Sequence, residues 1–218
     1  MRRPSPFVLV LLAVLAAGCG GGKSTTASSP PKALLDPSKL TARAPQLFTA
    51  TFKTTAGTFV VKVHRTWSPH GADRFYNLVK NGFYDGQKIF RVVPHFVVQF
   101  GISPYPEVSR AWETADIPDD ELGSLHNRRG TVDFASAGPG TRTTQIFVNT
   151  ADNLQLDGAG FTPIGEVTTG MDAVDKLYSG YADAPTQDQA QMMAQGNAYL
   201  EKAWPKLDGV ESATVALP

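Results

Sequence analysis

The stretch from Ile89 to Gly101, read as IFRVVPHFVVQFG, places two polar side chains in a densely apolar sequence. Its β-branched and aromatic residues are typical of a pair of buried strands. Arg91 could act as a fixed donor toward electron density that develops in a reaction, and Gln99 could orient its planar guanidinium. The alternative is a buried strand whose two polar side chains only reach the rim by their long stems. The stretch alone favours neither interpretation.

The spacing within this stretch predicts which side chains share a face. Alternation along a strand puts Val97 on the same face as Gln99. Pro94 cannot donate to a strand ladder and predicts a turn, which would bring Phe96 onto the face of Arg91. The prediction is therefore a guanidinium, an aromatic ring, an aliphatic side chain and an amide on one apolar surface.

Other common catalytic arrangements are missing from the sequence. Cys19 is the only cysteine, so a catalytic cysteine or a structural zinc site in the folded domain is not expected. The loop Ser136 to Thr144 is rich in small residues but lacks the Lys-Ser/Thr ending of a phosphate-binding loop. Asp119 and Asp120 lie in a polar run and are predicted to be solvated surface residues. No metal-ligand spacing is present among the histidines, which are His64, His70, His95 and His126.

The length and composition predict one globular domain with appendages. The chain has 218 residues, of which 42% are hydrophobic, and this is enough for a sizeable core. Its 20 basic and 20 acidic residues give no net charge, so nothing favours nucleic acid as a partner.

The N-terminal segment predicts export and attachment to a membrane. Arg2 and Arg3 precede the apolar run Phe7 to Ala17, which has the length of a signal-peptide core. The run ends in AAGC, which resembles the lipobox of bacterial lipoproteins, so residues 1–18 are expected to be removed and Cys19 to be lipidated. Such lipoproteins usually have Leu where the first of these alanines stands. The alternative is an ordinary secretory signal followed by an incidental cysteine.

Residues 19–46 are predicted to be a flexible tether. This segment is rich in Gly, Ser, Thr, Pro and Ala and has no apolar periodicity. As a random coil it would reach roughly 30 Å, enough to hold the domain at 47–218 clear of lipid head groups.

Hydrophobic periodicity and turn residues predict many short strands and few helices. Residues 48–64 read as a strand pair around Ala56-Gly57, and Ser68-Pro69 begins an amphipathic helix that stops at Asn81-Gly82. This content indicates a closed antiparallel β structure, because closure removes exposed edges. The remaining predicted elements are strands within 131–135, 145–148, 158–167 and 211–217, a short helix within 170–177 and a longer outer helix within 186–204.

Two long motifs in the chain resemble the cyclophilin family of peptidyl-prolyl cis-trans isomerases. They are FRVVPHFVVQFG and GTVDFASAGPGTRTTQIFVNTADNLQLDGAGFTPIGEV. The resemblance extends from Phe48 to Pro218 and is closest between Ile89 and Val174. It implies a mainly β fold, a closed eight-stranded antiparallel barrel capped by helices, to which this chain adds a C-terminal helix.

The resemblance also assigns roles to individual residues. It implies that Arg91 is the catalytic arginine and that Gln99 holds this arginine and the substrate. It implies that the backbone of Ser136 receives the substrate chain. The walls of the proline pocket would be formed by Phe96, Val97, Phe147 and Leu156, and the adjoining groove by Ala135, Ala137 and Gln145.

Two positions depart from the family pattern. Gln155 stands where many members have Trp, which argues against tight cyclosporin binding. Gly160, followed by Phe161, stands where many have a pocket His, with one extra residue before Gly165. Phe161 is expected to form the wall of the pocket that the histidine forms in those members.

The resemblance predicts an isomerase that needs no cofactor or metal. It would act as a monomer on proline-containing polypeptides in the cell envelope, on the extracytoplasmic side of a bacterial membrane. Proline isomerisation can limit protein folding there. One alternative is a binding module or chaperone that holds proline-containing segments without turning them over. Another is a purely structural barrel, for which Arg91 would be unimportant.

Overall fold

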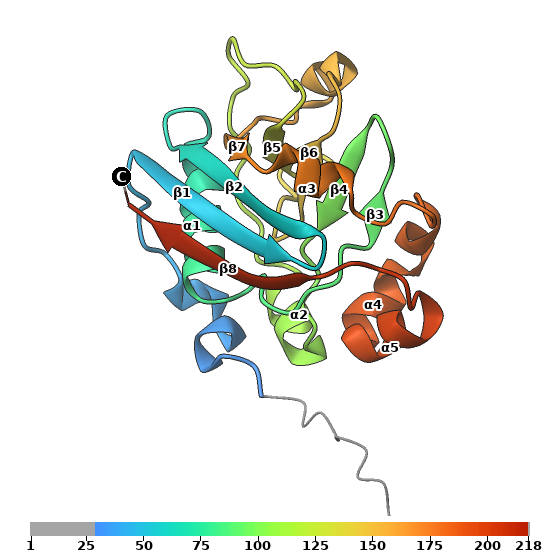
Figure 1. Ribbon diagram of the computed structural model, residues 1–218. Helices are drawn as coiled ribbons and strands as arrows, with labels where there is room; N and C mark the ends of the chain where they lie inside the picture. The colour runs from blue at the N-terminus through green and yellow to red at the C-terminus, as the bar shows by residue number, and fades with distance from the viewer. Residues whose placement is uncertain (1–28, 218) are drawn as a thin grey trace, which may run out of the picture.

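Figure 1 shows the computed structural model, which describes residues 29–217. The predicted signal peptide and the lipidation site at Cys19 lie outside these residues. Within 29–217, no helix is both long enough and apolar enough to cross a membrane.

The centre of the fold is a single antiparallel sheet of eight strands, as predicted from the sequence. The strands lie in the order β3-β4-β6-β5-β7-β2-β1-β8. Each pair of neighbours is antiparallel. The strands are β1 (Leu47–Thr54), β2 (Gly57–His64), β3 (Arg91–Val92), β4 (Val97–Phe100), β5 (Thr131–Phe134), β6 (Ile146–Asn149), β7 (Gly165–Thr169) and β8 (Val210–Ala216).

The sheet curls into a half-barrel, and the predicted full closure is not reached. The edge strands β3 and β8 are not paired with each other in the described chain. Hydrogen bonds join the segment before β3 to the segment before β8 and to the first residue of β8, as from the Ile89 N–H to the Asp208 carbonyl and from the Gly86 N–H to the Val210 carbonyl, both at 2.9 Å. Because β3 has only two residues, it offers too short an edge for a continuous ladder with β8.

Aromatic side chains fill the interior of the curled sheet. In the β1–β2 hairpin Phe52 lies opposite Phe59, and their rings stack at 4.9 Å. Phe52 also meets the edge of Phe100 from β4 at 5.6 Å. Phe75, on the apolar face of α1 (Pro69–Lys80), is completely buried against this group. The hairpin and α1 confirm the elements predicted between residues 48 and 81.

The start of α1 is capped by a carboxylate that lies far away in the sequence. Ser68 makes no side-chain cap, and its hydroxyl donates instead to the carboxylate of Asp120 at 2.5 Å. The same carboxylate accepts two backbone N–H groups in the first turn of α1, at 3.0 and 2.9 Å. The Asp120 side chain is only 3% exposed, so its assignment to the solvated surface is wrong, whereas Asp119 is 40% exposed.

The segment before β1 packs on the domain, although the sequence predicts a flexible tether up to residue 46. It contains the short 3-10 helices η1 (Lys32–Leu35) and η2 (Pro37–Lys39). Leu34 is 1% exposed, and its carbonyl accepts the indole N–H of Trp112 at 2.8 Å. Trp112 ends α2 (Pro106–Trp112), a helix that the sequence analysis did not predict. Burial of Leu34 and the hydrogen bond from the Trp112 side chain to its carbonyl thus hold this part of the predicted tether.

The C-terminal part contains more breaks than expected. α3 (Met171–Asp175) confirms the predicted short helix. The single helix predicted within 186–204 is wrong, because η4 (Ala184–Asp188), α4 (Gln189–Gln195) and α5 (Asn197–Ala203) take its place. α4 and α5 are separated at Gly196, whose φ of 61° favours glycine and whose Cβ, if it had one, would collide with the carbonyl oxygen of Pro104. Both helices lie at one edge of the barrel, beside β3 (Figure 1).

Candidate active site

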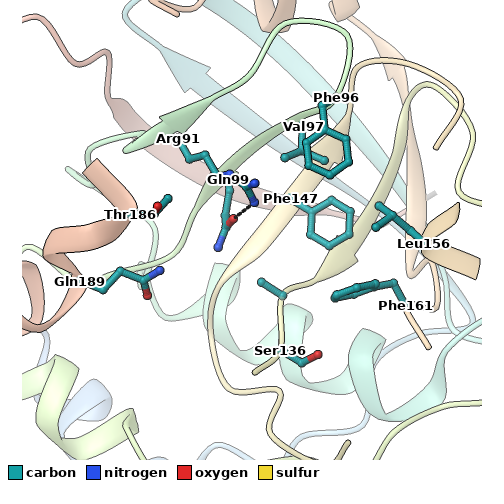
Figure 2. A pocket seen from close by; sticks show the side chains of 11 residues that line it. Arg91, Phe96, Val97, Gln99, Ser136, Phe147, Leu156, Phe161, Thr186 and Gln189 are labelled. Carbon is teal, nitrogen blue, oxygen red and sulfur yellow. Dashed lines mark hydrogen bonds between the residues drawn. The ribbon is translucent and has the colours of Figure 1, made fainter. Parts of the chain in front are cut away.

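A cavity of about 270 Å³ opens on the half-barrel between β3, β4 and β6 and the C-terminal helices (Figure 2). It is lined by Arg91, Phe96, Val97, Gln99, Ala135, Ser136, Phe147, Leu156, Phe161, Thr186 and Gln189. All of the predicted site residues are in this list except Ala137 and Gln145. Those two line an adjoining cavity of about 190 Å³, which shares Gln99 with the first. The structure therefore brings every predicted site residue of the domain into one groove.

The polar side of the cavity is a chain of side-chain hydrogen bonds. β3 and β4 pair so that Arg91 lies directly opposite Gln99. An Nη1 N–H of Arg91 donates to Gln99 Oε1 at 3.0 Å, and Gln99 Nε2 donates to Gln145 Oε1 at 2.9 Å. Gln145 Nε2 then donates to Gln189 Oε1, in α4, at 3.0 Å. These bonds fix the plane of the guanidinium and the direction of each amide.

The turn at Pro94 places an aromatic ring next to the arginine. The guanidinium carbon of Arg91 lies 5.4 Å from the ring centroid of Phe96, within the range of a cation–π contact. The carbonyl of Phe96 accepts the Thr150 N–H at 2.9 Å and Asn153 Nδ2 at 2.8 Å. The juxtaposition predicted from the central stretch is thus present, and buried hydrogen bonds anchor the turn.

The other side of the cavity is apolar. Val97 is 1% exposed and Phe147 is 4% exposed, so both form a closed floor. The ring of Phe161 meets that of Phe147 edge to face at 5.4 Å and 80°. Figure 2 shows these side chains gathered with Phe96 and Leu156 on the side away from Gln189. A small apolar ring can be buried here while its polar neighbours face Arg91.

The segment that carries Leu156 is held by a carboxylate. Asp157 accepts the backbone and side-chain N–H groups of Asn127, at 2.8 and 2.9 Å, and contacts His126 Nδ1 at 2.8 Å. Desolvation alone would raise the pKa of Asp157, but the Asn127 and His126 contacts outweigh it and lower that pKa. Asn127 Nδ2 also donates to the Phe161 carbonyl at 3.1 Å. One loop therefore positions both outer walls of the apolar pocket.

A glycine directly after β4 lets the chain of side-chain hydrogen bonds from Arg91 to Gln189 form. Gly101 has a φ of 124°, and a Cβ there would lie 2.6 Å from the Thr144 carbonyl oxygen and would also overlap Gln145. Only glycine allows the two backbones to approach this closely. The approach brings Gln145 within hydrogen-bonding reach of Gln99.

Behind the site, β5 carries a buried carboxyl group. Asp133 is completely buried opposite Phe147, and its Oδ2 accepts Asn149 Nδ2 at 3.2 Å. Burial, together with the nearby charge of Asp157, raises the pKa of Asp133 well above its usual value. Its buried surroundings therefore favour the uncharged, protonated form of Asp133 over the carboxylate.

Among residues 29–217, no group of three or more His, Cys, Asp or Glu side chains lies close enough together to hold a metal ion. The groups that face the cavity are a guanidinium, amides, the hydroxyl groups of Ser136 and Thr186, and apolar side chains. They can bind, orient and polarise a chain segment, and none of them is a nucleophile with an adjacent general base.

Residues 49–196 match the family model described as "Cyclophilin type peptidyl-prolyl cis-trans isomerase/CLD". The chain belongs to this family. A peptidyl-prolyl cis-trans isomerase of Acinetobacter baylyi is 35% identical over 139 residues, which cover 62% of this chain and 71% of that protein. Peptidyl-prolyl cis-trans isomerase B of Escherichia coli is 29% identical over 175 residues, which cover 76% of this chain and 98% of that protein. The chain is thus a cyclophilin-type isomerase.

Solved structures support the fold independently. A cyclophilin-type peptidyl-prolyl cis-trans isomerase of Cryptosporidium parvum superposes with a TM-score of 0.61 at 16% identity. The superposition covers 79% of this chain and 99% of that one. The eight-stranded antiparallel sheet is therefore that of the cyclophilins.

The sequence analysis missed three residues at the site of this cyclophilin, all from the C-terminal part. Thr186 and Gln189 line the cavity, and Asp183 forms an ion pair with Arg91. The apolar spacing of residues 186–204 predicts a helix but not where it docks. In contrast, Gln155 is exposed and does not line the cavity.

Proposed function

We propose that this cyclophilin accelerates the rotation of Xaa-Pro bonds by means of Arg91, as a monomer acting on polypeptides outside the cytoplasm. The observation that carries the proposal is the position of Arg91, held by Gln99 at 3.0 Å and stacked near Phe96 at the edge of an apolar pocket. The pocket has the size and chemistry for a proline ring. A proline ring bound among the apolar side chains would bring its nitrogen toward the guanidinium of Arg91, which lines the same cavity.

Rotation about the Xaa-Pro bond is slow because amide resonance sets a barrier of roughly 18–20 kcal/mol. As the bond twists, resonance is lost and the lone pair localises on the prolyl nitrogen. An N–H of Arg91 that points at this nitrogen stabilises the twisted state more than the planar one, which lowers the barrier. Phe96, Val97 and Phe147 would hold the ring while the preceding carbonyl turns.

The test is the cis-to-trans relaxation of a short Xaa-Pro peptide, measured with the chain from residue 29 onward. This form keeps Leu34, which packs on the domain. We expect Arg91→Ala to lose most of the acceleration while its thermal unfolding stays near that of the wild type. Arg91→Lys is the matched control for charge, and it should also be slow because an ammonium lacks the planar fork that Gln99 orients.

Two results would contradict this mechanism. Near-wild-type turnover in Arg91→Ala would remove the arginine from the catalytic step. A folded wild-type chain that binds the peptide without accelerating its relaxation would favour the alternative of a non-catalytic module for proline segments.

We further propose that Cys19 carries a lipid that attaches the domain to the outer face of a bacterial membrane. The support is the apolar run Phe7 to Ala17, whose last two residues are the alanines of the AAGC sequence that ends in Cys19. The full-length chain, expressed in a bacterium, should fractionate with membranes and incorporate labelled palmitate. Cys19→Ser should lose the label and leave the membrane fraction. Equal labelling of both forms would reject the anchor.

A further inference from the structure

The C-terminal segment, residues 178–207, is anchored on the outside of the barrel by its own small core. Met192, Leu200 and Leu207 are at most 8% exposed and pack against Phe90 and Ile102. Phe90 directly precedes Arg91 in the chain. The segment is therefore fixed to the part of the barrel that presents the catalytic arginine.

The loop at the start of this segment has a defined shape. The ring of Tyr181 packs edge to face against Tyr178 at 5.1 Å and against Trp204 at 5.0 Å. Ala182 follows with a φ of 47°, in the left-handed region that alanine rarely adopts. After Asp183, the Thr186 hydroxyl and N–H both bond the Asp183 carbonyl, at 2.6 and 2.9 Å, and so start η4. These contacts hold the backbone of Asp183 against β3.

The Asp183 carboxylate accepts the Nε–H of Arg91. Gln99 accepts an Nη1 N–H of the same guanidinium. Two hydrogen bonds on different nitrogens fix the guanidinium plane. Either hydrogen bond alone would leave the guanidinium free to rotate about that bond. Residues 29–217 engage these two of the five N–H donors of Arg91, which leaves the other three to face a bound chain.

We propose that Asp183 is a positioning residue for Arg91, and that the C-terminal segment is thereby a working part of the active site. The inference rests on the proposed function of Arg91. A donor stabilises a twisted amide only when its N–H points at the nitrogen within a narrow range of angles. By holding Nε, Asp183 keeps the Nη groups in that direction before substrate arrives.

The negative charge of Asp183 could instead weaken the electrostatic effect of Arg91 on a bound substrate, by partly neutralising the positive charge of the guanidinium. The Asp183 side chain is 56% exposed and that of Arg91 is 25% exposed, so water screens the field that the carboxylate exerts on a substrate. The hydrogen bond is short-ranged and its directional effect is not screened in the same way. We therefore expect the positioning effect to exceed the loss of charge.

The experiment compares Asp183→Ala with Asp183→Asn by exchange NMR on an Xaa-Pro peptide, which separates the rate on the enzyme from the affinity. Asparagine keeps an oxygen that can accept the Arg91 Nε–H, whereas alanine does not. We expect Asp183→Ala to lower the on-enzyme rate by about threefold to fivefold with unchanged affinity, the size of effect available to a partly exposed pair. Asp183→Asn should retain most of the rate.

Asp175→Ala is the matched control. It removes an ion pair of comparable exposure, with Arg129 at 2.6 Å, that does not line the cavity. Its rate should equal that of the wild type. An unchanged rate in Asp183→Ala would overturn the proposal. So would a faster rate, or a loss that lies only in affinity.

A second readout distinguishes failure of this inference from failure of the proposed function. The ¹H–¹⁵N signal of Arg91 Nε, assigned by its loss in Arg91→Lys, should exchange slowly with water in the wild type and rapidly in Asp183→Ala. This measurement needs no catalysis. Rapid exchange in both forms would reject the proposal that Asp183 holds the Arg91 Nε–H. If the wild-type chain proved inactive as an isomerase but still showed slow exchange at Arg91 Nε, only the proposed activity would be rejected.

Discussion

Replacing Asp120 with alanine should destabilise the fold more than replacing any exposed charged residue with alanine, because the Asp120 carboxylate joins three parts of the chain. It accepts the Ser68 hydroxyl and two N–H groups at the start of α1. It also pairs with Arg142 Nη2 at 2.9 Å, where both side chains are at most 5% exposed. Arg142 lies in the loop that follows Ser136 and Ala137 in the groove.

The magnitude follows from what Asp120→Ala leaves behind. Arg142 keeps the Pro118 carbonyl and a 3.3 Å ion pair with Asp119, so its charge is only partly compensated. Breaking a buried pair from one side costs about 3–5 kcal/mol, and loss of a helix cap alone costs about 1 kcal/mol. Because these losses overlap, we expect a total of about 3–5 kcal/mol. For a domain of this size, that corresponds to a fall in melting temperature of about 6–20 °C.

The pH dependence gives the reasoning a second test. Desolvation would raise the pKa of Asp120, but the Ser68 hydroxyl, the backbone N–H groups and Arg142 outweigh it and lower that pKa. The stabilisation is therefore complete above the usual carboxyl pKa of about 3.9. It is lost as the pH falls through the lowered pKa of the folded state. The difference between wild type and Asp120→Ala should shrink in acid.

Urea unfolding followed by tryptophan fluorescence, at pH 7 and at successively lower pH, measures both effects. Asp119→Ala is the control, because its side chain is 40% exposed and its loss should cost less than about 1 kcal/mol. A change below about 1 kcal/mol for Asp120→Ala at pH 7 would refute the assignment of a buried, stabilising network.

Three further substitutions test other parts of the structure. Asp133→Asn should become more stable relative to wild type as the pH rises above the usual carboxyl pKa of about 3.9, because the folded state keeps the Asp133 proton that the unfolded chain releases there; a pH-independent difference in urea unfolding would disprove the raised pKa. Phe161→Ala removes the ring that contacts Phe147 and should weaken peptide binding by about twofold to tenfold in an NMR titration; unchanged binding would exclude Phe161 from the pocket wall. Leu34→Ala should destabilise the domain by about 2–4 kcal/mol in thermal or urea unfolding, since Leu34 is 1% exposed; no change would mean that residues before β1 do not pack on it.

The elements best predicted from the sequence are those whose signals are local. The β1–β2 hairpin follows from alternation around a turn, and α1 from apolar spacing with a first-turn proline. The face shared by Arg91, Phe96 and Gln99 follows from strand geometry and the turn at Pro94. Each of these features depends on residues fewer than about 20 positions apart, for which backbone geometry limits the choices.

The features that were missed depend on partners far away in the chain. Nothing near Asp120 reveals that it caps a helix 50 residues earlier, and a pair of aspartates in a polar run looks solvated. The break at Gly196 follows from the backbone of Pro104, which approaches too closely for a side chain. Leu34 stands in a low-complexity context, yet Trp112 offers it a buried contact. Local patterns cannot encode such pairings.

The same distinction explains the two halves of the active site. The floor of the apolar pocket and the Arg91–Gln99 pair come from neighbouring strands, and a motif in the sequence is enough to predict them. The outer anchor of Arg91 comes from Asp183, 92 residues later, and depends on how the C-terminal segment docks. The strands provide Arg91 and the floor of the pocket. Under the proposed role of Asp183, the orientation of the guanidinium depends in addition on the docked C-terminal segment. Rate and fold stability should therefore respond separately to substitutions at Asp183.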